Sequence, residues 1–204
     1  LRSAEEHSDT LVMACNTLSV QYRKLQLSKT PLSGPQYVVS MVDCFEALVR
    51  AERSRLANKN VLVVGTRYTA SQSLYPDIID AAIAGARISA IAATELERVI
   101  ARFESWDSTD ESVLTHELRL ALQDTDVAVL ACTCFPVVVA ILESQFPHVT
   151  FLDPGAYCAG LLPKHTAMRD KRLRIKVTGD AVSAARAVEF AESHLGTGDI
   201  ECCT

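Results

Sequence analysis

The chain has 204 residues, of which 49% are hydrophobic, and it carries a formal net charge of -5 with a pI near 5.5. This length and hydrophobic content suit one large domain or two small ones, with a core that needs no disulfide bonds. The acidic balance gives no electrostatic basis for binding nucleic acid or an anionic membrane, so small molecules are the expected ligands.

Strand and helix patterns alternate along the chain. Short apolar runs predict strands over residues 10–14, 37–42, 61–64, 87–91, 127–131, 149–152 and 174–177. Apolar residues at three- and four-residue spacing predict helices over residues 43–56, 71–84, 111–122, 136–145 and 181–195. This alternation is typical of βαβ units around a mostly parallel sheet.

Cysteine usage indicates a reducing compartment. The seven cysteines are an odd number spread through a long chain, unlike the dense, even set of a small secreted domain. The sequence contains no run of roughly 18 apolar residues, which is the length needed to span a bilayer. Its first residues lack the apolar core of a signal peptide. We therefore expect a cytoplasmic protein with free thiols and no membrane partner.

Two of the predicted strands end in a cysteine that is followed by polar residues. Cys15 begins the sequence Cys-Asn-Thr, and Cys132 begins Cys-Thr-Cys. In open α/β sheets the carboxyl ends of the strands lead into helices and carry the ligand chemistry. The positive end of a helix dipole also stabilises a thiolate. We therefore predict that both thiols lie at helix N-termini and belong to one site.

The motifs around these cysteines resemble those of the cofactor-independent aspartate/glutamate racemases, and of glutamate racemase most. The family's Ala-Cys-Asn-Thr is present at residues 14–17, and its Gly-Cys-Thr-His-Tyr/Phe-Pro corresponds to residues 131–136, with Cys134 in place of the histidine. The family's Gly-Thr-x-x-Thr turn is present at residues 65–69. Asp-Pro-Gly at 153–155 and Thr-Gly-Asp at 178–180 resemble the family's final strand and helix.

The resemblance implies an α/β fold of two doubly wound domains with mostly parallel sheets, related by pseudo-two-fold symmetry. Residues 1–36 and 151–204 would form the remainder of the first domain, and residues 37–150 the second, with the active site in the cleft between them. The first domain would be incomplete, because the family's initial strand and Asp-Ser-Gly turn have no counterpart here. The sequence is therefore expected to be either a truncated or partly observed molecule or a natural remnant.

Racemisation explains why two thiols would be needed. The Cα proton is removed on one face and a proton is returned on the other, so a base and an acid must flank that carbon. A thiol with an ordinary pKa of about 8.5 can serve as either. By resemblance, Cys15 would act on the D-enantiomer and Cys132 on the L-enantiomer. The substrate carboxylate would be held by backbone N–H groups and by the side chains of Asn16, Thr17, Thr66, Thr69 and Thr133.

The implied function is the interconversion of L- and D-glutamate for peptidoglycan synthesis, without a cofactor or a metal. Glutamate would be the small-molecule partner, and a homodimer is left open. One alternative is a truncated or non-catalytic relative that keeps a dicarboxylate-binding cleft, supported by the missing Asp-Ser-Gly turn and by Cys134. The other is an aspartate or hydantoin racemase of the same superfamily.

Individual residues also have simpler interpretations. A buried cysteine after a strand is more often a core residue than a base. Thr66 and Thr69 could cap the helix predicted from Ser71, and Asn16 could cap the helix that follows it. Cys132 and Cys134 could hold a metal together with Cys158 or a histidine. Core filling is the expected role of Cys44 and Cys158, and Cys202 and Cys203 lie at a terminus where fraying is expected.

Overall fold

The computed structural model describes residues 10–27, 37–101 and 114–163, and the backbone of 173–176 and 200–203. The chain divides into two compact units, Leu1–Pro163 and Lys164–Thr204. In the second unit, β7 (Leu173–Lys176) pairs in parallel with β8 (Ile200–Cys203). Cys202 and Cys203 therefore lie in a strand where a frayed terminus was predicted. The Thr-Gly-Asp segment at 178–180 and the helix predicted over 181–195 lie outside the described residues.

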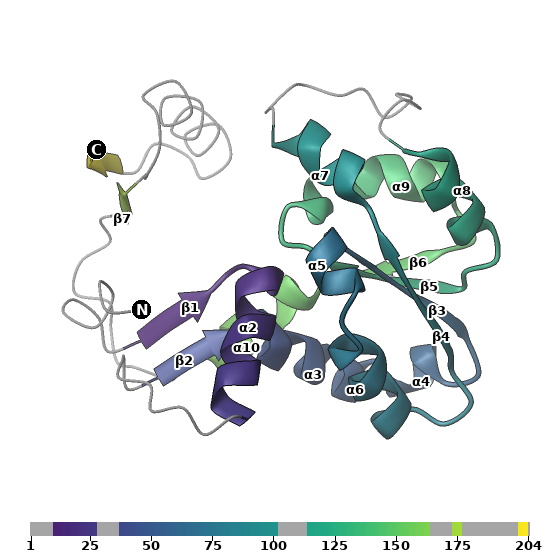
Figure 1. Ribbon diagram of the computed structural model, residues 1–204, viewed down its shortest axis with the longest axis horizontal. Helices are drawn as coiled ribbons and strands as arrows, with labels where there is room; N and C mark the ends of the chain where they lie inside the picture. The colour runs from purple at the N-terminus through teal and green to yellow at the C-terminus, as the bar shows by residue number, and fades with distance from the viewer. Residues whose placement is uncertain (1–9, 28–36, 102–113, 164–172, 177–199, 204) are drawn as a thin grey trace. The chain divides into compact units, whose positions relative to one another are not determined.

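A four-stranded parallel sheet forms the centre of the first unit (Figure 1). Its strand order is β4-β3-β5-β6, and all three neighbouring pairs are parallel. The strands are β3 (Asn60–Gly65), β4 (Arg87–Ala92), β5 (Val127–Ala131) and β6 (Thr150–Leu152). Every residue of β5, and all of β3 after Asn60, is buried. Such continuous apolar runs are expected for central strands of a parallel sheet that is covered on both faces.

Alternate residues of β3 and β5 pack into two separate cores, one on each face of the sheet. Val61 and Val63 contribute to the core with α3 (Met41–Ala51), α4 (Arg53–Leu56) and α6 (Leu74–Ala82). Leu62 and Val64 contribute to the core with α7 (Thr94–Ile100), α8 (His116–Gln123) and α9 (Val139–Gln145). Figure 1 shows these two groups of helices on opposite sides of the sheet. The predicted α/β class with parallel sheets is confirmed.

A smaller parallel sheet precedes this one in the chain. It pairs β1 (Thr10–Met13) with β2 (Tyr37–Ser40), and β1 leads into α2 (Asn16–Leu27). The strand predicted over 37–42 ends early because Ser40 caps α3. The Ser40 hydroxyl accepts a hydrogen bond from the Asp43 N–H, and the Asp43 carboxylate accepts one from the Ser40 N–H at 2.8 Å. Met41 and Val42 are therefore helical.

The pairing of β2 with β1 places the start of the predicted second domain in the smaller sheet. The division into residues 1–36 with 151–204 and residues 37–150 stays a prediction, as does the pseudo-two-fold symmetry. Helical boundaries also differ in places from those predicted. The helix predicted over 43–56 is divided into α3 and α4, and α6 begins at Leu74 rather than at residue 71.

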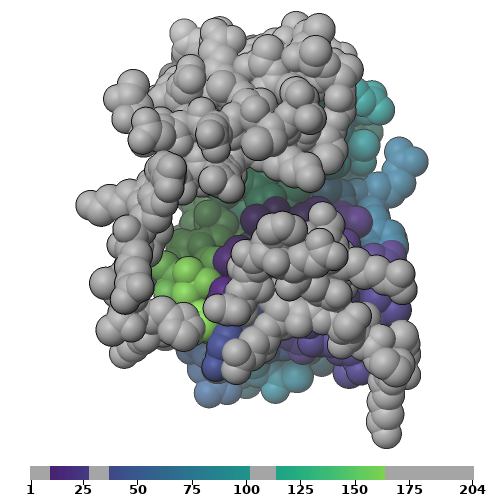
Figure 2. All heavy atoms as spheres, turned by 90° about the vertical axis from the view of Figure 1, so that its left-hand side faces the viewer, coloured from purple at the N-terminus to yellow at the C-terminus, as the bar shows by residue number. Residues whose placement is uncertain are grey.

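Short helical turns complete the first unit. These are α5 (Arg67–Ala70), η2 (Phe135–Val138), η3 (Pro154–Tyr157) and α10 (Cys158–Leu161). None of the residues of α10 is fully buried, and the light green atoms at the end of this unit reach the surface in Figure 2. Within the described part of the chain, no helix has the length and apolar character needed to cross a membrane.

Candidate active site

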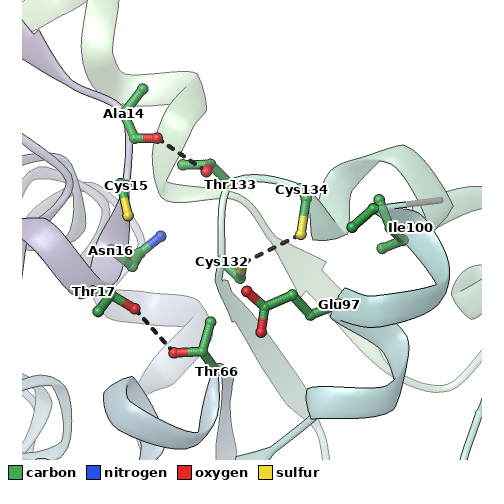
Figure 3. A pocket seen from close by; sticks show the side chains of 11 residues that line it. Ala14, Cys15, Asn16, Thr17, Thr66, Glu97, Ile100, Cys132, Thr133 and Cys134 are labelled. Carbon is green, nitrogen blue, oxygen red and sulfur yellow. Dashed lines mark hydrogen bonds between the residues drawn. The ribbon is translucent and has the colours of Figure 1, made fainter. Parts of the chain in front are cut away.

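A pocket of about 350 Å³ opens at the carboxyl ends of β1, β3 and β5 (Figure 3). From β3 the sheet grows to β4 on one side and to β5 on the other, so a topological switch point lies between β3 and β5. Open α/β sheets bind ligands at such points. Seven of the eight residues predicted for the site line this pocket: Cys15, Asn16, Thr17, Thr66, Cys132, Thr133 and Cys134.

Cys15 lies in the short connection between β1 and α2, immediately before the helix. Its carbonyl accepts the Ser19 N–H at 2.9 Å, which is the first hydrogen bond of the helix, and its thiol is exposed. The Ser19 hydroxyl donates to the Met13 carbonyl at 3.1 Å and accepts the Met41 N–H at 2.9 Å. This buried hydroxyl fixes the turn to the start of α3. The predicted position of Cys15 at a helix N-terminus agrees with the structure.

Asn16 presents an unpaired donor to the pocket. Its side-chain Oδ1 accepts a hydrogen bond from the Tyr75 hydroxyl at 2.6 Å, so its amide nitrogen must point the other way. Burial raises the pKa of Tyr75, which keeps the phenol protonated as the donor. Among the described residues, Asn16 Nδ2 is buried and has no hydrogen-bond partner. Figure 3 shows this nitrogen directed between Cys15 and Cys132.

We predict that Tyr75→Phe lowers the free energy of unfolding by about 1–3 kcal/mol, because the buried Asn16 Oδ1 then loses its donor. Urea denaturation measures this loss. Tyr68→Phe is the matched control, since the hydrogen bond of the Tyr68 hydroxyl among the described residues is an exposed one, from Lys24 at 3.4 Å. The control is expected to change stability by less than about 0.5 kcal/mol. Equal stabilities of the two variants would contradict the role of Tyr75.

Three threonine hydroxyls form a second group of polar atoms. Thr66 Oγ1 lies 3.1 Å from both Thr17 Oγ1 and Thr69 Oγ1, and the Thr17 and Thr69 hydroxyls are 3.5 Å apart. Thr66 also caps α5 by accepting the Thr69 N–H at 3.2 Å, so it caps this short helix rather than the one predicted from Ser71. Thr69 is buried behind the other two, outside the pocket lining. Gly65 permits this packing, because a Cβ there would lie 3.1 Å from Thr69 Cβ.

Cys132 directly follows β5 and is buried, in contrast to Cys15. The chain continues into the 3₁₀ turn η2, where the Phe135 N–H donates to the Cys132 carbonyl at 3.0 Å. The predicted α-helix at 136–145 therefore begins only at Val139. Thr133 links the segment after β5 to the segment after β1, because its hydroxyl donates to the Ala14 carbonyl at 3.1 Å. That proton is thus engaged by the backbone rather than directed at a ligand.

Cys134 contacts the sulfur of Cys132. The two Sγ atoms lie 3.3 Å apart, which is well beyond a disulfide bond of about 2.05 Å and fits a thiol–thiol hydrogen bond. The hydrogen bond from Cys134 is the main cause that lowers the pKa of Cys132, and the Cys134 backbone N–H adds to it. The same contact, with burial, raises the pKa of Cys134. The arrangement favours a thiolate at Cys132 with Cys134 as its donor.

Replacing Cys134 with alanine is therefore expected to raise the pKa of Cys132. Less thiolate would be present at neutral pH, so Cys132 would be alkylated more slowly by iodoacetamide near pH 7, with the difference vanishing at high pH. Peptide mass spectrometry of the Cys132 peptide over a pH series measures this. Cys158→Ala serves as the control, because it removes a half-buried thiol outside the pocket lining. A pH profile that is the same in all three proteins would contradict the hydrogen bond.

The described residues bring no third metal ligand to Cys132 and Cys134. Among the residues that the structure describes, no group of three or more His, Cys, Asp or Glu side chains could hold a metal ion. Cys158, one of the proposed third ligands, packs instead against the buried Cys44. Burial, followed by the contact with Cys158, raises the pKa of Cys44 to about 12. Both cysteines thus belong to a small core cluster, as predicted.

One wall of the pocket was not predicted from the sequence. Glu97, Ile100 and Ala101 line it from α7 and the residue after it. The only signal for α7 was the four-residue spacing of Leu96 and Ile100, which are both buried. Figure 3 shows the Glu97 carboxylate directed toward Cys132. The negative charge of Glu97 raises the pKa of both Cys132 and Cys134. This effect is smaller than that of the hydrogen bond between the two thiols.

The chain is similar in sequence to glutamate racemases. It is 28% identical over 147 residues to glutamate racemase 3 of Caldanaerobacter subterraneus, a match that covers 71% of this chain and 50% of the relative. It is 24% identical over 187 residues to a glutamate racemase of Streptococcus sanguinis, covering 89% of this chain and 68% of the relative. The chain thus spans about half the length of the first of these relatives and two thirds of the second.

Solved structures of glutamate racemases share the fold. An isoform from Bacillus anthracis superposes with a TM-score of 0.67 at 20% identity, over 96% of this chain and 74% of that one. The Escherichia coli enzyme superposes with a TM-score of 0.63 at 20% identity, over 95% of this chain and 73% of that one. The profile of the Asp/Glu/hydantoin racemase family matches residues 1–162, which is most of the sequence. The chain belongs to the Asp/Glu/hydantoin racemase family.

Proposed function

We propose that the protein containing this chain interconverts L- and D-glutamate, with Cys15 and Cys132 as its two acid–base groups. One observation carries the proposal: two cysteines that are distant in the sequence follow two different strands and line the same pocket. A lone buried cysteine would be explained by packing, but two thiols that share a pocket are what proton removal and return at one carbon require. Family membership supports the same chemistry.

The two thiols would act on opposite faces of the Cα carbon. With an L-amino acid, the Cys132 thiolate takes the Cα proton and becomes a thiol. The Cys15 thiol then donates its proton to the opposite face and becomes a thiolate, which leaves the D-enantiomer bound. In the reverse direction the roles exchange. No electrons are gained or lost, and solvent resets the two protonation states after the product leaves.

Polar groups of the pocket would stabilise the charge that develops during proton removal. The Cα proton is a very weak acid, and the negative charge left on the carbon spreads into the neighbouring carboxylate. Asn16 Nδ2 is a buried donor that has no partner in the described part of the chain, and the hydroxyls of Thr17 and Thr66 reach the same pocket. The N-terminus of the twelve-residue helix α2 adds backbone N–H groups beside them. Donors that are already oriented need no rearrangement in the transition state.

The relatives indicate the substrate. Both curated relatives carry the name glutamate racemase, and the Escherichia coli structure was determined with L-glutamate and an activator, UDP-MurNAc-ala. We extend this substrate to the present protein as its small-molecule partner. The same proposal includes a cytoplasmic supply of D-glutamate for peptidoglycan and catalysis without a cofactor or metal. It also includes a homodimeric assembly and the two-domain division at residues 37 and 150.

A second candidate is a non-catalytic relative that keeps a dicarboxylate-binding cleft. It is favoured by Cys134, which replaces the histidine of the family motif and cannot supply an imidazole's second hydrogen bond. Its thiol nevertheless contacts Cys132 at 3.3 Å and supplies a donor to that sulfur. An aspartate or hydantoin racemase would use the same two thiols, so only the substrate would differ.

The proposal is tested by assaying the full protein with each enantiomer of glutamate, without added pyridoxal phosphate or metal. Circular dichroism follows the conversion continuously, and the expected result is racemisation in both directions. Binding of glutamate without any conversion would favour the non-catalytic relative. Activity that is lost with a chelator and restored by zinc would replace the two-thiol mechanism with a metal-dependent one. Aspartate and a hydantoin, assayed in parallel, would identify a sister activity.

A further inference from the structure

The pocket contains a carboxylate, that of Glu97, which no charged group of the described residues balances. Glu97 is the one charged side chain among the described residues that line the pocket. On the same helix, Glu95 and Arg98 form an ion pair with each other at 2.9 Å. Within the described part of the chain, no hydrogen bond or ion pair engages the carboxylate of Glu97, which is half-buried. A ligand that carries a positive charge would balance it.

The hydrogen-bond donors of the pocket come from other elements. Glu97 belongs to α7 and lies beside Cys132, whereas Asn16 and Thr17 come from the start of α2 and lie toward Cys15 (Figure 3). The pocket therefore offers an anionic acceptor on one side and neutral donors on the other. An α-amino acid carries an ammonium group and a carboxylate on the same carbon. Its two charged groups match the two kinds of group in the pocket.

We propose that Glu97 binds the α-ammonium group of the amino-acid substrate and thereby orients its Cα between the two thiols. This inference rests on the proposed racemase function and assigns a substrate-binding residue to it. A charge-assisted hydrogen bond between ammonium and carboxylate is stronger than a neutral one and is favoured in a partly dry pocket. The carboxylate also favours the protonated form of the amine. The retained ammonium charge then stabilises the negative charge that develops on the adjacent carbon.

The same contact would link substrate binding to the state of Cys132. In the free pocket the charge of Glu97 raises the pKa of Cys132 and opposes the thiolate. When an ammonium group neutralises Glu97, this opposition is reduced. Substrates that carry the ammonium would therefore promote the formation of the base that removes their proton, whereas a carboxylic acid that lacks it would not.

The test compares two ligands and three proteins. L-glutamate and glutarate are both dicarboxylates of the same carbon-chain length, but only glutamate carries the ammonium group. Their binding to the full wild-type protein, to Glu97→Gln and to Glu95→Gln is measured by calorimetry. Glu95 is the matched control, because it lies on the same helix, is exposed and pairs with Arg98.

Wild-type protein is expected to prefer glutamate to glutarate. Glu97→Gln should weaken glutamate binding by about tenfold or more, while glutarate binding stays equal or improves. Glu95→Gln should change neither. The inference is overturned if Glu97→Gln weakens both ligands equally, if it changes neither, or if the wild-type protein shows no preference. If the wild-type protein prefers glutamate to glutarate and Glu97→Gln removes this preference, but the wild-type protein does not racemise glutamate, the proposed function is refuted. Glu97 would still be the ammonium-binding residue.

Discussion

Replacing either Cys15 or Cys132 with serine is expected to lower the racemisation of glutamate by about a thousandfold or more in both directions. A serine hydroxyl is far too weak an acid or base to take the place of a thiol at neutral pH. Since each thiol is the base in one direction and the acid in the other, loss of either one interrupts both directions. Turnover numbers of the full protein from each enantiomer measure the effect. Cys158→Ser, outside the pocket lining, is the control and should retain activity.

The two serine variants should differ in a half-reaction. The thiolate that remains can still remove the Cα proton of a β-substituted glutamate of matching handedness and so expel the leaving group. Cys15→Ser is expected to process the L-type isomer, and Cys132→Ser the D-type isomer. Elimination is followed by formation of the keto acid. Wild-type racemisation by both variants would mean that the cysteines are core residues and that the two-thiol mechanism is wrong.

The second large effect is on stability. Phe45→Ala is expected to lower the free energy of unfolding by about 3–5 kcal/mol. Phe45 is fully buried in the core between α3 and the four-stranded sheet, and its ring centroid lies 4.3 Å from that of Tyr75. The alanine would leave a cavity beside the tyrosine whose hydroxyl orients Asn16. The loss in stability would therefore be accompanied by a less ordered first turn of the site.

Urea denaturation with Leu18→Ala as the control measures this effect. Leu18 is 53% exposed on α2, so its truncation should change stability by less than about 0.5 kcal/mol. A loss below about 1 kcal/mol for Phe45→Ala would contradict the packing of this core. Thermal unfolding of the same proteins should give the same order of stability.

The central sheet and the meeting of the two cysteine turns could be predicted from the sequence. The continuous apolar runs of β3 and β5 indicated buried parallel strands, and carboxyl ends of parallel strands lie at one edge of a sheet. Thr66 and Cys132 therefore had to lie near one another once the strands were correct. Cys15 follows a strand of the smaller sheet, so its place beside them was predicted from the paired cysteine motifs and not from strand direction. The strand end at Ser40 was missed because a local capping box outweighed the β-propensity of the residues that follow.

The contacts that tune the site could not be predicted, because they depend on distant residues or on the shape of a turn. Asn16 is oriented by Tyr75, which lies 59 residues away. If the strand continued, Cys132 and Cys134 would point to the same face but lie about 6.6 Å apart along the chain, and the turn after β5 brings their sulfurs to 3.3 Å. Glu97 was missed because a helix as short as α7 gives a weak periodic signal.

Deuterium exchange at Cα tests the two-thiol mechanism most directly. The full protein is incubated with L-glutamate in deuterium oxide, and the two enantiomers are separated at low conversion and analysed by mass spectrometry. If Cys132 removes the proton and Cys15, which has exchanged with solvent, returns a deuteron, then the D-glutamate carries deuterium while the recovered L-glutamate keeps its hydrogen. Starting from D-glutamate, the pattern should be reversed. Deuterium that enters the recovered substrate as fast as the product, or hydrogen retained in the product, would contradict two thiols acting on opposite faces.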